Sequence, residues 1–269
     1  GAFAGPPLAA LAPYADLAIE TVLTLRLVFH LPLRQAEGFV HSLLAMMDLD
    51  LPTPDHTTLS RRSSSLKPVL NHRSCPTEPV HLIVDSTGLS IHGEGPWSSG
   101  KKRRRGWRKL HIMVDGNGFV RSSCVSKWHT RDGSRVRQLF DGFDGEVASL
   151  TGDKGYDQNS VYRIVGKRNP DAQTVIHPRV NAVLSGSDEW TQRDLHVHKI
   201  RSEGVETWRR ESGYYRQSTV ENTFYRYKTI IGKRLRARGE AARQVEAAIA
   251  CKILNGCLEL GGAESVPVV

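Results

Sequence analysis

The stretch "VHLIVDSTGL", residues 80–89, decides the fold class of the chain. Its run of β-branched and leucine residues is typical of a buried β-strand, and the run ends at Asp85, which Ser, Thr and Gly follow. Comparable short runs recur as far as about residue 178, whereas the residues before 80 show helical spacing. The sequence therefore predicts that a β-rich region begins at about residue 80.

The segments after residue 89 predict an α/β fold with a mixed sheet of five strands. The motif "DGNG" (115–118) predicts a hairpin between the second and third strands. Helices expected on both sides of the fourth strand make the later part alternate between helix and strand, which is typical of a mixed sheet flanked by helices. The later strands are expected in "RKLHIMVDGNG" (108–118), "FVRSSCVS" (119–126), "EVASLTGDKG" (146–155) and "AQTVIHP" (172–178), and the helices at about 134–142 and 157–168.

The residues before this region predict a helical N-terminal domain, residues 1–70. Asp16 is a candidate cap for the first helix. Asp55 opens "DHTTLSRRSSSL", which is either an ordinary polar helix or the second helix of a helix-turn-helix DNA-binding unit. A linker rich in Gly, Pro and Ser would then lead to a second domain, 78–262, with an irregular polar insertion at about 179–210.

Three acids stand where the local structure does not require them. Asp85 and Asp153 each follow a run of strand residues, although aspartate is disfavoured in strands and costly to bury without a cation. Glu221 lies among aromatic, basic and amide side chains on a predicted helix. Taken singly, Asp153 could begin a turn, Asp85 could cap a loop and Glu221 could be a plain surface residue. Taken together they favour a divalent-metal site, because hard carboxylate oxygens hold Mg²⁺ and phosphate oxygens complete its shell.

Helical spacing places several polar side chains on the same face as Glu221. We expect Lys228 on this face to hold nucleic-acid backbone beside the acid. The adjoining face is apolar and is expected to pack on the sheet. The polar set is Tyr214, Gln217, Tyr225 and Lys228, and the apolar set is Val220, Phe224, Tyr227 and Ile231.

The charge distribution favours a polyanionic partner. The net charge is +9 with a pI near 9.6, and residues 96–135 alone hold 11 Lys or Arg against two Asp. A cluster between the first two strands is expected to follow DNA backbone. This cluster consists of Lys101, Lys102, Arg103, Arg104 and Arg105.

Composition excludes several other classes of protein. With 39% hydrophobic residues the chain is globular. Its longest apolar stretch, 17–33, is interrupted by Glu20, Arg26 and Pro32, so we expect neither a membrane span nor a signal peptide. The four cysteines form no C-x-x-C pair and are expected to be buried thiols in a reducing compartment.

Four further polar residues have a structural interpretation beside a functional one. Asp132 could assist a metal or substrate, but the favoured interpretation is a cap for the helix that follows it, and Asp157 is likewise interpreted as a helix cap. His196 and His198 alternate along an expected extended segment and are interpreted as surface or loop residues rather than a zinc site.

Four segments resemble motifs of bacterial insertion-sequence transposases of the DDE type. The resemblance extends from about residue 14 to residue 261. It points to the insertion-sequence four/five-like group, in which a tyrosine–arginine–glutamate–lysine signature surrounds the last acid. The segments are "LIVDSTGL" (82–89), "WRKLHIMVDGNG" (107–118), "TGDKGYD" (151–157) and "STVENTFYRYKTIIGKRLRAR" (218–238).

The signature matches this chain except at one position. Tyr214 and Lys228 match its tyrosine and lysine, and Glu221 matches its acid. The arginine four residues before the acid is Gln217 here, with Arg216 one place earlier. The resemblance implies that these residues contact DNA.

The resemblance implies a ribonuclease-H-like catalytic domain. Asp85, Asp153 and Glu221 would be the catalytic triad that holds two Mg²⁺ ions, with Mn²⁺ able to substitute. The implied activity is cleavage and strand transfer of double-stranded DNA at terminal inverted repeats, by a homodimer in the bacterial cytoplasm, associated with the nucleoid. Two alternatives remain, a metal-dependent nuclease of the same fold that does not join DNA, and an inactive descendant that only binds DNA, which the Gln217 departure favours.

Overall fold

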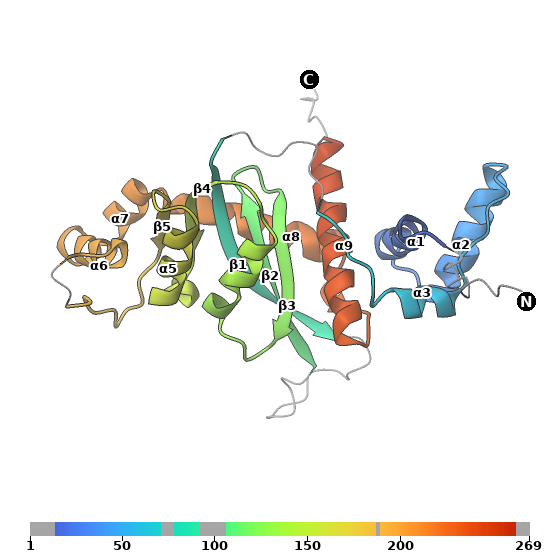
Figure 1. The fold of residues 1–269 in the computed structure, drawn as a ribbon, viewed down its shortest axis with the longest axis horizontal. Helices are drawn as coiled ribbons and strands as arrows, with labels where there is room; N and C mark the ends of the chain where they lie inside the picture. The colour runs from blue at the N-terminus through green and yellow to red at the C-terminus, as the bar shows by residue number, and fades with distance from the viewer. Residues whose placement is uncertain (1–13, 71–77, 92–105, 187–188, 262–269) are drawn as a thin grey trace, which may run out of the picture.

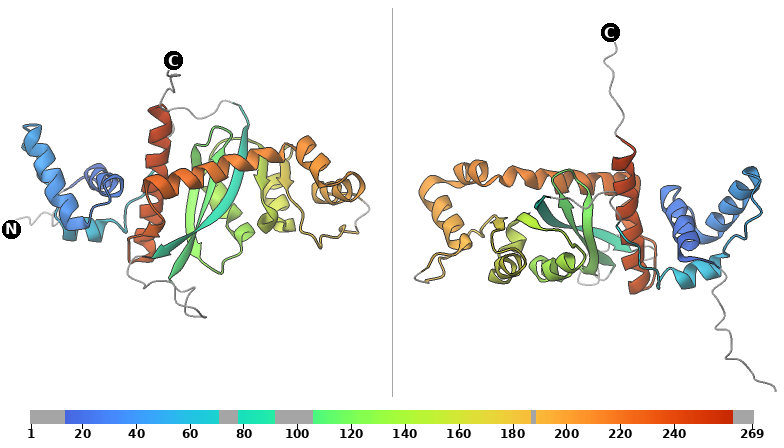
Figure 2. Two further views of the ribbon diagram at one scale, coloured as in Figure 1. Left: turned by 180° about the vertical axis from the view of Figure 1, so that it is seen from behind. Right: turned by 45° about the horizontal axis from the view of Figure 1, so that its top comes forward.

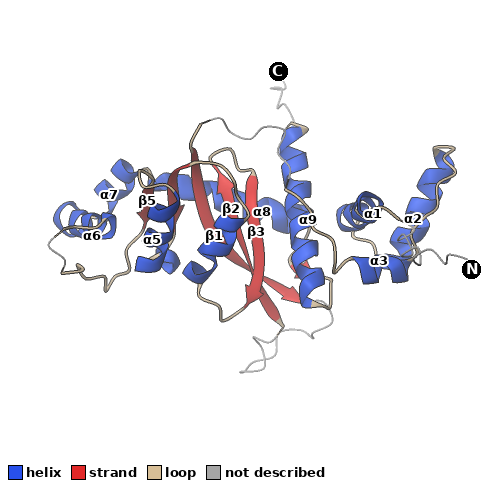
Figure 3. Cartoon of the chain, viewed as in Figure 1, coloured by secondary structure: helices blue, strands red, loops and turns tan. Residues whose placement is uncertain are grey.

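The computed structural model describes residues 14–70, 78–91, 106–186 and 189–261, so the basic cluster 101–105 lies outside the described residues. A central sheet has helices on both of its faces (Figures 1 and 3). The strands are β1 (Val80–Ile91), β2 (Trp107–Asp115), β3 (Val120–Lys127), β4 (Val147–Gly152), β5 (Gln173–Ile176) and β6 (Arg234–Leu235). The α-helices are α1 (Asp16–Val28), α2 (Leu33–Met46), α3 (His56–Arg62), α4 (Val136–Asp141), α5 (Asn159–Arg168), α6 (Gln192–Glu203), α7 (Val205–Ser212), α8 (Gln217–Ile230) and α9 (Glu240–Glu259). Short 3-10 helices are η2 (Asp132–Arg135), η3 (Lys154–Tyr156) and η4 (Tyr214–Arg216).

The sheet has the ribonuclease-H-like strand order. Its main path runs β3-β2-β1-β4-β5, with β2 antiparallel to both β1 and β3, and β4 parallel to both β1 and β5. The turn between Asp115 and Val120 joins β2 to β3 as a hairpin, and the chain reaches β4 and β5 through helices, as the sequence predicted. The prediction of five strands missed β6, which pairs with the end of β1. Strand β6 was missed because its two residues are too few to show the alternation of apolar and polar side chains that predicts a strand.

Alternation along β1 assigns its side chains to the two faces of the sheet. Ile83 and Leu89 join a hydrophobic cluster that also contains residues of α8 and α9, whereas Leu82 and Val84 join a second cluster with residues of α4 and α5. Figure 2 shows α8 crossing one face of the sheet, and Figure 1 shows α5 in front of the other. Asp85 lies two residues beyond Ile83, and therefore on the face that α8 covers.

The three N-terminal helices pack beside α9, on the side away from the strands (Figure 2). Ile19, Leu23 and Leu27 of α1 are buried in the same cluster as Ile249 and Leu254 of α9. These helices therefore share a core with the sheet. A separate N-terminal domain and a helix-turn-helix role for α3 both stay predictions.

One of the two predicted helix caps in this region is present. Asp55 accepts hydrogen bonds from the N–H groups of Thr57 and Thr58, each at 2.8 Å, and so begins α3 as predicted. Asp16 is not a cap, because it already lies inside α1. Its carboxylate pairs instead with the guanidinium of Arg62.

The expectation of an irregular insertion at 179–210 was wrong, because most of its second half is helical. Helix α6 begins at a capping box between Thr191 and Asp194. His196 lies on this helix, where its Nε2 donates to the carbonyl of Thr174 at 2.8 Å and its Nδ1 accepts from Trp208 Nε1 at 2.9 Å. Both ring nitrogens are thus used in packing α6 and α7 against β5.

Cys124 and Cys251 are buried free thiols, as expected, and Cys257 is a half-buried free thiol. Cys75 lies outside the described residues. Across the described ranges, no helix is both long enough and apolar enough to cross a membrane.

Candidate active site

Two of the predicted acids lie at the same level of neighbouring parallel strands. Val84 of β1 pairs with Gly152 of β4. Asp85 directly follows Val84, and Asp153 directly follows Gly152. Adjacent strands lie about 4.8 Å apart, so the two backbones carry the acids at close range. Asp85 is within β1 and Asp153 directly follows β4, which are the positions that the sequence predicted.

The turn after β4 lies beside a third carboxylate, that of Asp132 in η2. Asp153 Oδ1 accepts a hydrogen bond from Gly155 N at 2.8 Å, so Asp153 also begins a turn. A Cβ atom placed on Gly155 would lie 2.9 Å from Asp153 Oδ1 and 3.3 Å from Asp132 Oδ2. The carboxylates of Asp132 and Asp153 therefore converge on one residue that has no side chain.

Asp132 belongs to this acid cluster, although its favoured interpretation from sequence was a helix cap. That interpretation was wrong, because the N-cap of α4 is Arg135 and Asp132 caps neither helix of this segment. Its Oδ1 instead accepts hydrogen bonds from Ser86 Oγ and Lys109 Nζ, both at 2.9 Å. Lys109, which lies on β2, thus forms an ion pair with the Asp132 carboxylate.

Burial and neighbouring carboxylates raise the pKa values of two acids in this cluster. Burial raises the pKa of Asp85 to about 7, a hydrogen bond from Ser86 N opposes this, and the charges of Asp153, Asp132 and Glu221 raise the pKa further. Burial also raises the pKa of Asp153, and the Asp132 charge adds to this effect. Four acids from distant parts of the sequence therefore share one electrostatic environment, in which a cation would stabilise the ionised forms.

Helix α8 carries Glu221 to the sheet as its pattern predicted. Its apolar stripe is buried against β1 and β2 in one hydrophobic cluster, whereas Glu221 itself is exposed. The stripe consists of Val220, Phe224, Tyr227 and Ile231.

Tyr214, in the short helix η4 before α8, lies beside the same acids. Its ring packs against Trp208 and His177, with ring centroids 5.1 Å and 5.9 Å away. Burial raises the pKa of Tyr214 to about 12, and the charges of Asp153, Asp85 and Glu221 contribute. The phenol therefore keeps its proton and can act as a hydrogen-bond donor.

The other two signature positions, Gln217 and Lys228, and the neighbouring Arg216 have different surroundings. Gln217 is 7% exposed, and within the described chain its Oε1 has no hydrogen-bond partner. Arg216 Nη1 lies 3.3 Å from the Nδ1 atom of His81 near the start of β1, four residues before Asp85. Lys228 is seven residues after Glu221, about 10 Å along the helix axis, and lines a separate cleft.

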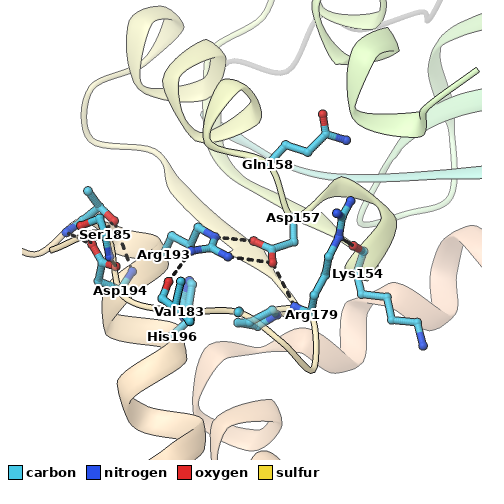
Figure 4. A network of polar contacts seen from close by, with 12 residues as sticks. Lys154, Asp157, Gln158, Arg179, Val183, Ser185, Arg193, Asp194 and His196 are labelled. Carbon is cyan, nitrogen blue, oxygen red and sulfur yellow. Dashed lines mark hydrogen bonds and ion pairs between the residues drawn. The ribbon is translucent and has the colours of Figure 1, made fainter.

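An ion pair anchors the turn that carries Asp153 (Figure 4). Asp157 Oδ1 accepts from Arg193 Nε at 2.6 Å, and Oδ2 accepts from Arg193 Nη2 at 3.1 Å and from Arg179 N at 2.9 Å. The interpretation of Asp157 as a helix cap was wrong, because the N-cap of α5 is Gln158. The contact instead ties the turn to α6, across 36 residues of sequence.

The donor set of the site suits a divalent cation. Among the described residues, no three His, Cys, Asp or Glu side chains already form a group that could hold a metal ion. Carboxylate oxygens are nevertheless the ligands that Mg²⁺ and Mn²⁺ prefer, and burial together with neighbouring carboxylates raises the pKa values of Asp85 and Asp153. Asp85, Asp153 and Glu221 would hold the metal, with Asp132 beside them.

Comparisons with known proteins identify a family for the chain. A family model described as "Transposase DDE domain" matches residues 76–255, and a second model with the same description matches residues 9–94. Among solved structures, the chain is similar to the piggyBac transposase in a synaptic complex with hairpin DNA, with 16% sequence identity and a TM-score of 0.41. That match covers 70% of this chain and 50% of the other, so the chain spans about half the length of that transposase. Because the first model spans more than half of the 269 residues and includes every strand of the sheet, the chain belongs to the transposase DDE domain family.

Proposed function

We propose that the protein is a DNA transposase of the tyrosine–arginine–glutamate–lysine group, which cuts and rejoins DNA at the terminal inverted repeats of an insertion sequence. The observation that carries this proposal is the position of Asp85 within β1 and of Asp153 directly after β4, at the same level of two neighbouring parallel strands. The effect of the Glu221 charge on the pKa of Asp85 supports a site shared by all three acids. Membership of the DDE family supports the class of reaction.

In this proposal the three acids hold Mg²⁺ or Mn²⁺, and other residues keep them in place. Bound divalent ions activate water or a DNA 3′-hydroxyl for attack on a phosphodiester and stabilise the leaving oxygen. Lys109 holds the Asp132 carboxylate beside the triad. Tyr214 remains protonated and donates a hydrogen bond to a phosphate oxygen.

The DNA would be held mainly through its backbone. The net charge of +9 supports a polyanionic partner. We assign phosphate contacts to Arg216, Lys228 and the cluster 101–105, and an amide contact to Gln217. The proposed assembly on double-stranded DNA is a homodimer, which holds two element ends at once.

The test is a cleavage and joining assay with the ends of the protein's own element. Wild-type protein should nick the ends with Mg²⁺ or Mn²⁺, and should insert a pre-cleaved end into a target plasmid. Asp85→Asn and Glu221→Gln keep the side-chain shape but remove the charge, so both reactions should fall at least about 100-fold while end binding survives. Asp141→Asn, an exposed acid at the end of α4, is the matched control and should retain activity.

Each rival function gives its own result in this assay. Cleavage without joining of pre-cleaved ends would identify a nuclease. Binding of ends without either reaction would identify an inactive descendant, which is the outcome that Gln217 in place of arginine favours. Normal metal-dependent cleavage by Asp85→Asn would refute the proposed triad.

A further inference from the structure

A cleft of about 1160 Å³ lies away from the acid cluster, between the N-terminal helices and the C-terminal part of the chain. Helix α1 and the end of α3 form one wall, and the opposite wall consists of the end of α8, the 231–239 connection and the start of α9. Figures 1 and 2 show these N-terminal helices beside α9. The volume exceeds that of a typical pocket for one small ligand.

The lining of this basic cleft is strongly cationic. Six Lys or Arg residues line it against one acid, Glu246. The Glu246 carboxylate is already engaged, because its oxygens accept hydrogen bonds from the backbone N–H groups of Arg236 and Ala237 at 2.8 Å and 2.6 Å. It therefore holds the 231–239 connection and offsets only part of the positive charge. The six cations are Arg26, Lys228, Lys233, Arg234, Arg236 and Arg238.

The connection presents its arginines to the cleft. In "RLRAR" (234–238) every second residue is arginine, and in the two-residue strand β6 the side chains of Arg234 and Leu235 point to opposite sides. Leu235 is 1% exposed and belongs to the core, whereas Arg234, Arg236 and Arg238 all line the cleft. Pairing of β6 with the end of β1 fixes this orientation.

Several of these cations have no carboxylate partner among the described residues. Across the described ranges, the side chains of Lys228, Arg234 and Arg238 form no ion pair with a carboxylate. Arg26 is half-buried at the wall formed by α1, and its Nε is buried without a hydrogen-bond partner in the described part of the chain. Arg236 is different, because it donates to the carbonyl of Leu31 at 3.3 Å and so has a structural role.

We propose that this basic cleft is a second DNA-binding surface, which holds the phosphodiester backbone of duplex DNA next to the segment that enters the acid cluster. The inference rests on the proposed function, because it takes DNA as the substrate. Unpaired cations on both walls match a polyanion with closely spaced charges. Lys228 joins the cleft to the acids, because it lines the cleft and lies on the same helix as Glu221.

The chain's own N-terminal segment does not match the charge of the cleft. Residues 1–13 contain no acidic side chain. Single phosphates and nucleotides are smaller than the cleft and would engage only some of its cations. The charge on both walls thus favours a long polyanion.

The test measures duplex binding by fluorescence anisotropy over a series of salt concentrations, with a duplex of unrelated sequence. Arg234→Ala/Arg238→Ala removes two exposed cations from the cleft. It should weaken binding at least about tenfold and reduce the slope of log affinity against log salt by about 1.8, the value for two lost phosphate contacts. Arg137→Ala/Lys167→Ala removes the same charge from a hollow on α4 and α5 and should leave the slope unchanged. Arg234→Lys/Arg238→Lys should retain wild-type binding, which separates charge from folding.

The outcomes separate this inference from the proposed function. Equal losses of duplex affinity in the two alanine variants would overturn the proposed role of the basic cleft, even if metal-dependent cleavage is normal. A specific loss in the cleft variant would support it, even if the protein proves unable to cleave. Absence of duplex binding by wild-type protein, or release of the duplex by millimolar inorganic phosphate or dATP at constant ionic strength, would also overturn it.

Discussion

Asp85 and Asp153 stand one residue beyond a backbone pair, Val84 with Gly152, that joins two parallel strands. The sheet therefore forces the two carboxylates together, although 68 residues of sequence separate them. Burial raises the pKa of both acids, and the Asp153 charge raises the pKa of Asp85 further. In the proposed metal site a bound cation would offset this repulsion, and we therefore expect divalent metal to stabilise the folded protein.

The first prediction follows from the raised pKa of Asp85. An acid with a folded-state pKa of about 7, above its ordinary value of 3.8, favours the fold when protonated. The metal-free protein should therefore lose stability as pH rises from about 4 to 7, and change little above that range. Mn²⁺ affinity should rise as the pH increases toward 7, by up to about tenfold per pH unit, because the metal must displace the proton from Asp85.

Thermal unfolding with and without Mn²⁺ between pH 5.5 and 8 measures both effects. Asp85→Asn should flatten the pH dependence of the metal-free protein and lose most of the Mn²⁺ stabilisation. The same Mn²⁺ stabilisation at pH 5.5 and pH 8 would contradict the assignment of Asp85 as a ligand.

The second prediction concerns Gly155, on which two carboxylates converge. Gly155→Ala places a methyl group 2.9 Å from Asp153 Oδ1 and 3.3 Å from Asp132 Oδ2, so the carboxylates must shift. Cleavage should fall about 100-fold, because a displacement near 1 Å at a reacting centre has an effect of that order. The control is Gly166→Ala on α5, where a Cβ meets nothing within 4 Å and stability should rise slightly. If both variants cleave equally well, the carboxylates at Gly155 have no part in the reaction.

The third prediction tests Lys109 as the cation that holds Asp132. Lys109→Met removes the ammonium that donates to Asp132 and that lowers the pKa of Asp153. The pH of half-maximal cleavage should therefore shift upward, by about one unit. Lys127→Met, an exposed lysine at the end of β3, should leave the pH profile unchanged. A lower maximal rate without any shift in the profile would assign Lys109 a different role.

The fourth prediction concerns the ion pair that anchors the Asp153 turn. Arg193→Met leaves Asp157, whose side chain is 0% exposed, without its cation, which should lower the free energy of unfolding by about 3 kcal/mol. Arg209→Met breaks an exposed pair with Glu206 and should cost less than about 0.5 kcal/mol. Urea denaturation compares the two variants. Similar small losses would mean that backbone contacts alone anchor the turn.

The sequence was sufficient where a pattern repeats over several residues. The apolar run before Asp85 located β1, and the "DGNG" motif located the hairpin, in which Asp115 accepts from the N–H groups of Asn117 and Phe119. The helical stripe on α8 was also correct, because burial against a sheet demands one apolar side at a period of 3.6 residues.

The sequence was insufficient where contacts join distant segments. Asp132 accepts from Ser86 and Lys109, and no local pattern indicates either contact. Helix α6 was missed because it is mostly polar, although the spacing of Thr191 and Asp194 is a capping signal that could have located it. Arg216 was expected to contact DNA, which stays a prediction, and no local pattern indicates its contact with His81.

The last prediction concerns Gln217, where the family pattern has arginine. Gln217→Arg restores that pattern one turn before Glu221, but it places a guanidinium at a position that is only 7% exposed. The free protein should therefore lose about 1–3 kcal/mol of stability, whereas cleavage of element ends should become faster if the guanidinium reaches the terminal phosphate. Gln217→Met is the control, because it removes the unpaired Oε1 and should raise stability by about 1 kcal/mol without any gain in rate. Thermal unfolding and single-turnover cleavage measure the two effects separately. A Gln217→Arg protein that is less stable and no faster would indicate that this lineage has moved the phosphate contact elsewhere, and Arg216→Ala would then show whether Arg216 supplies it.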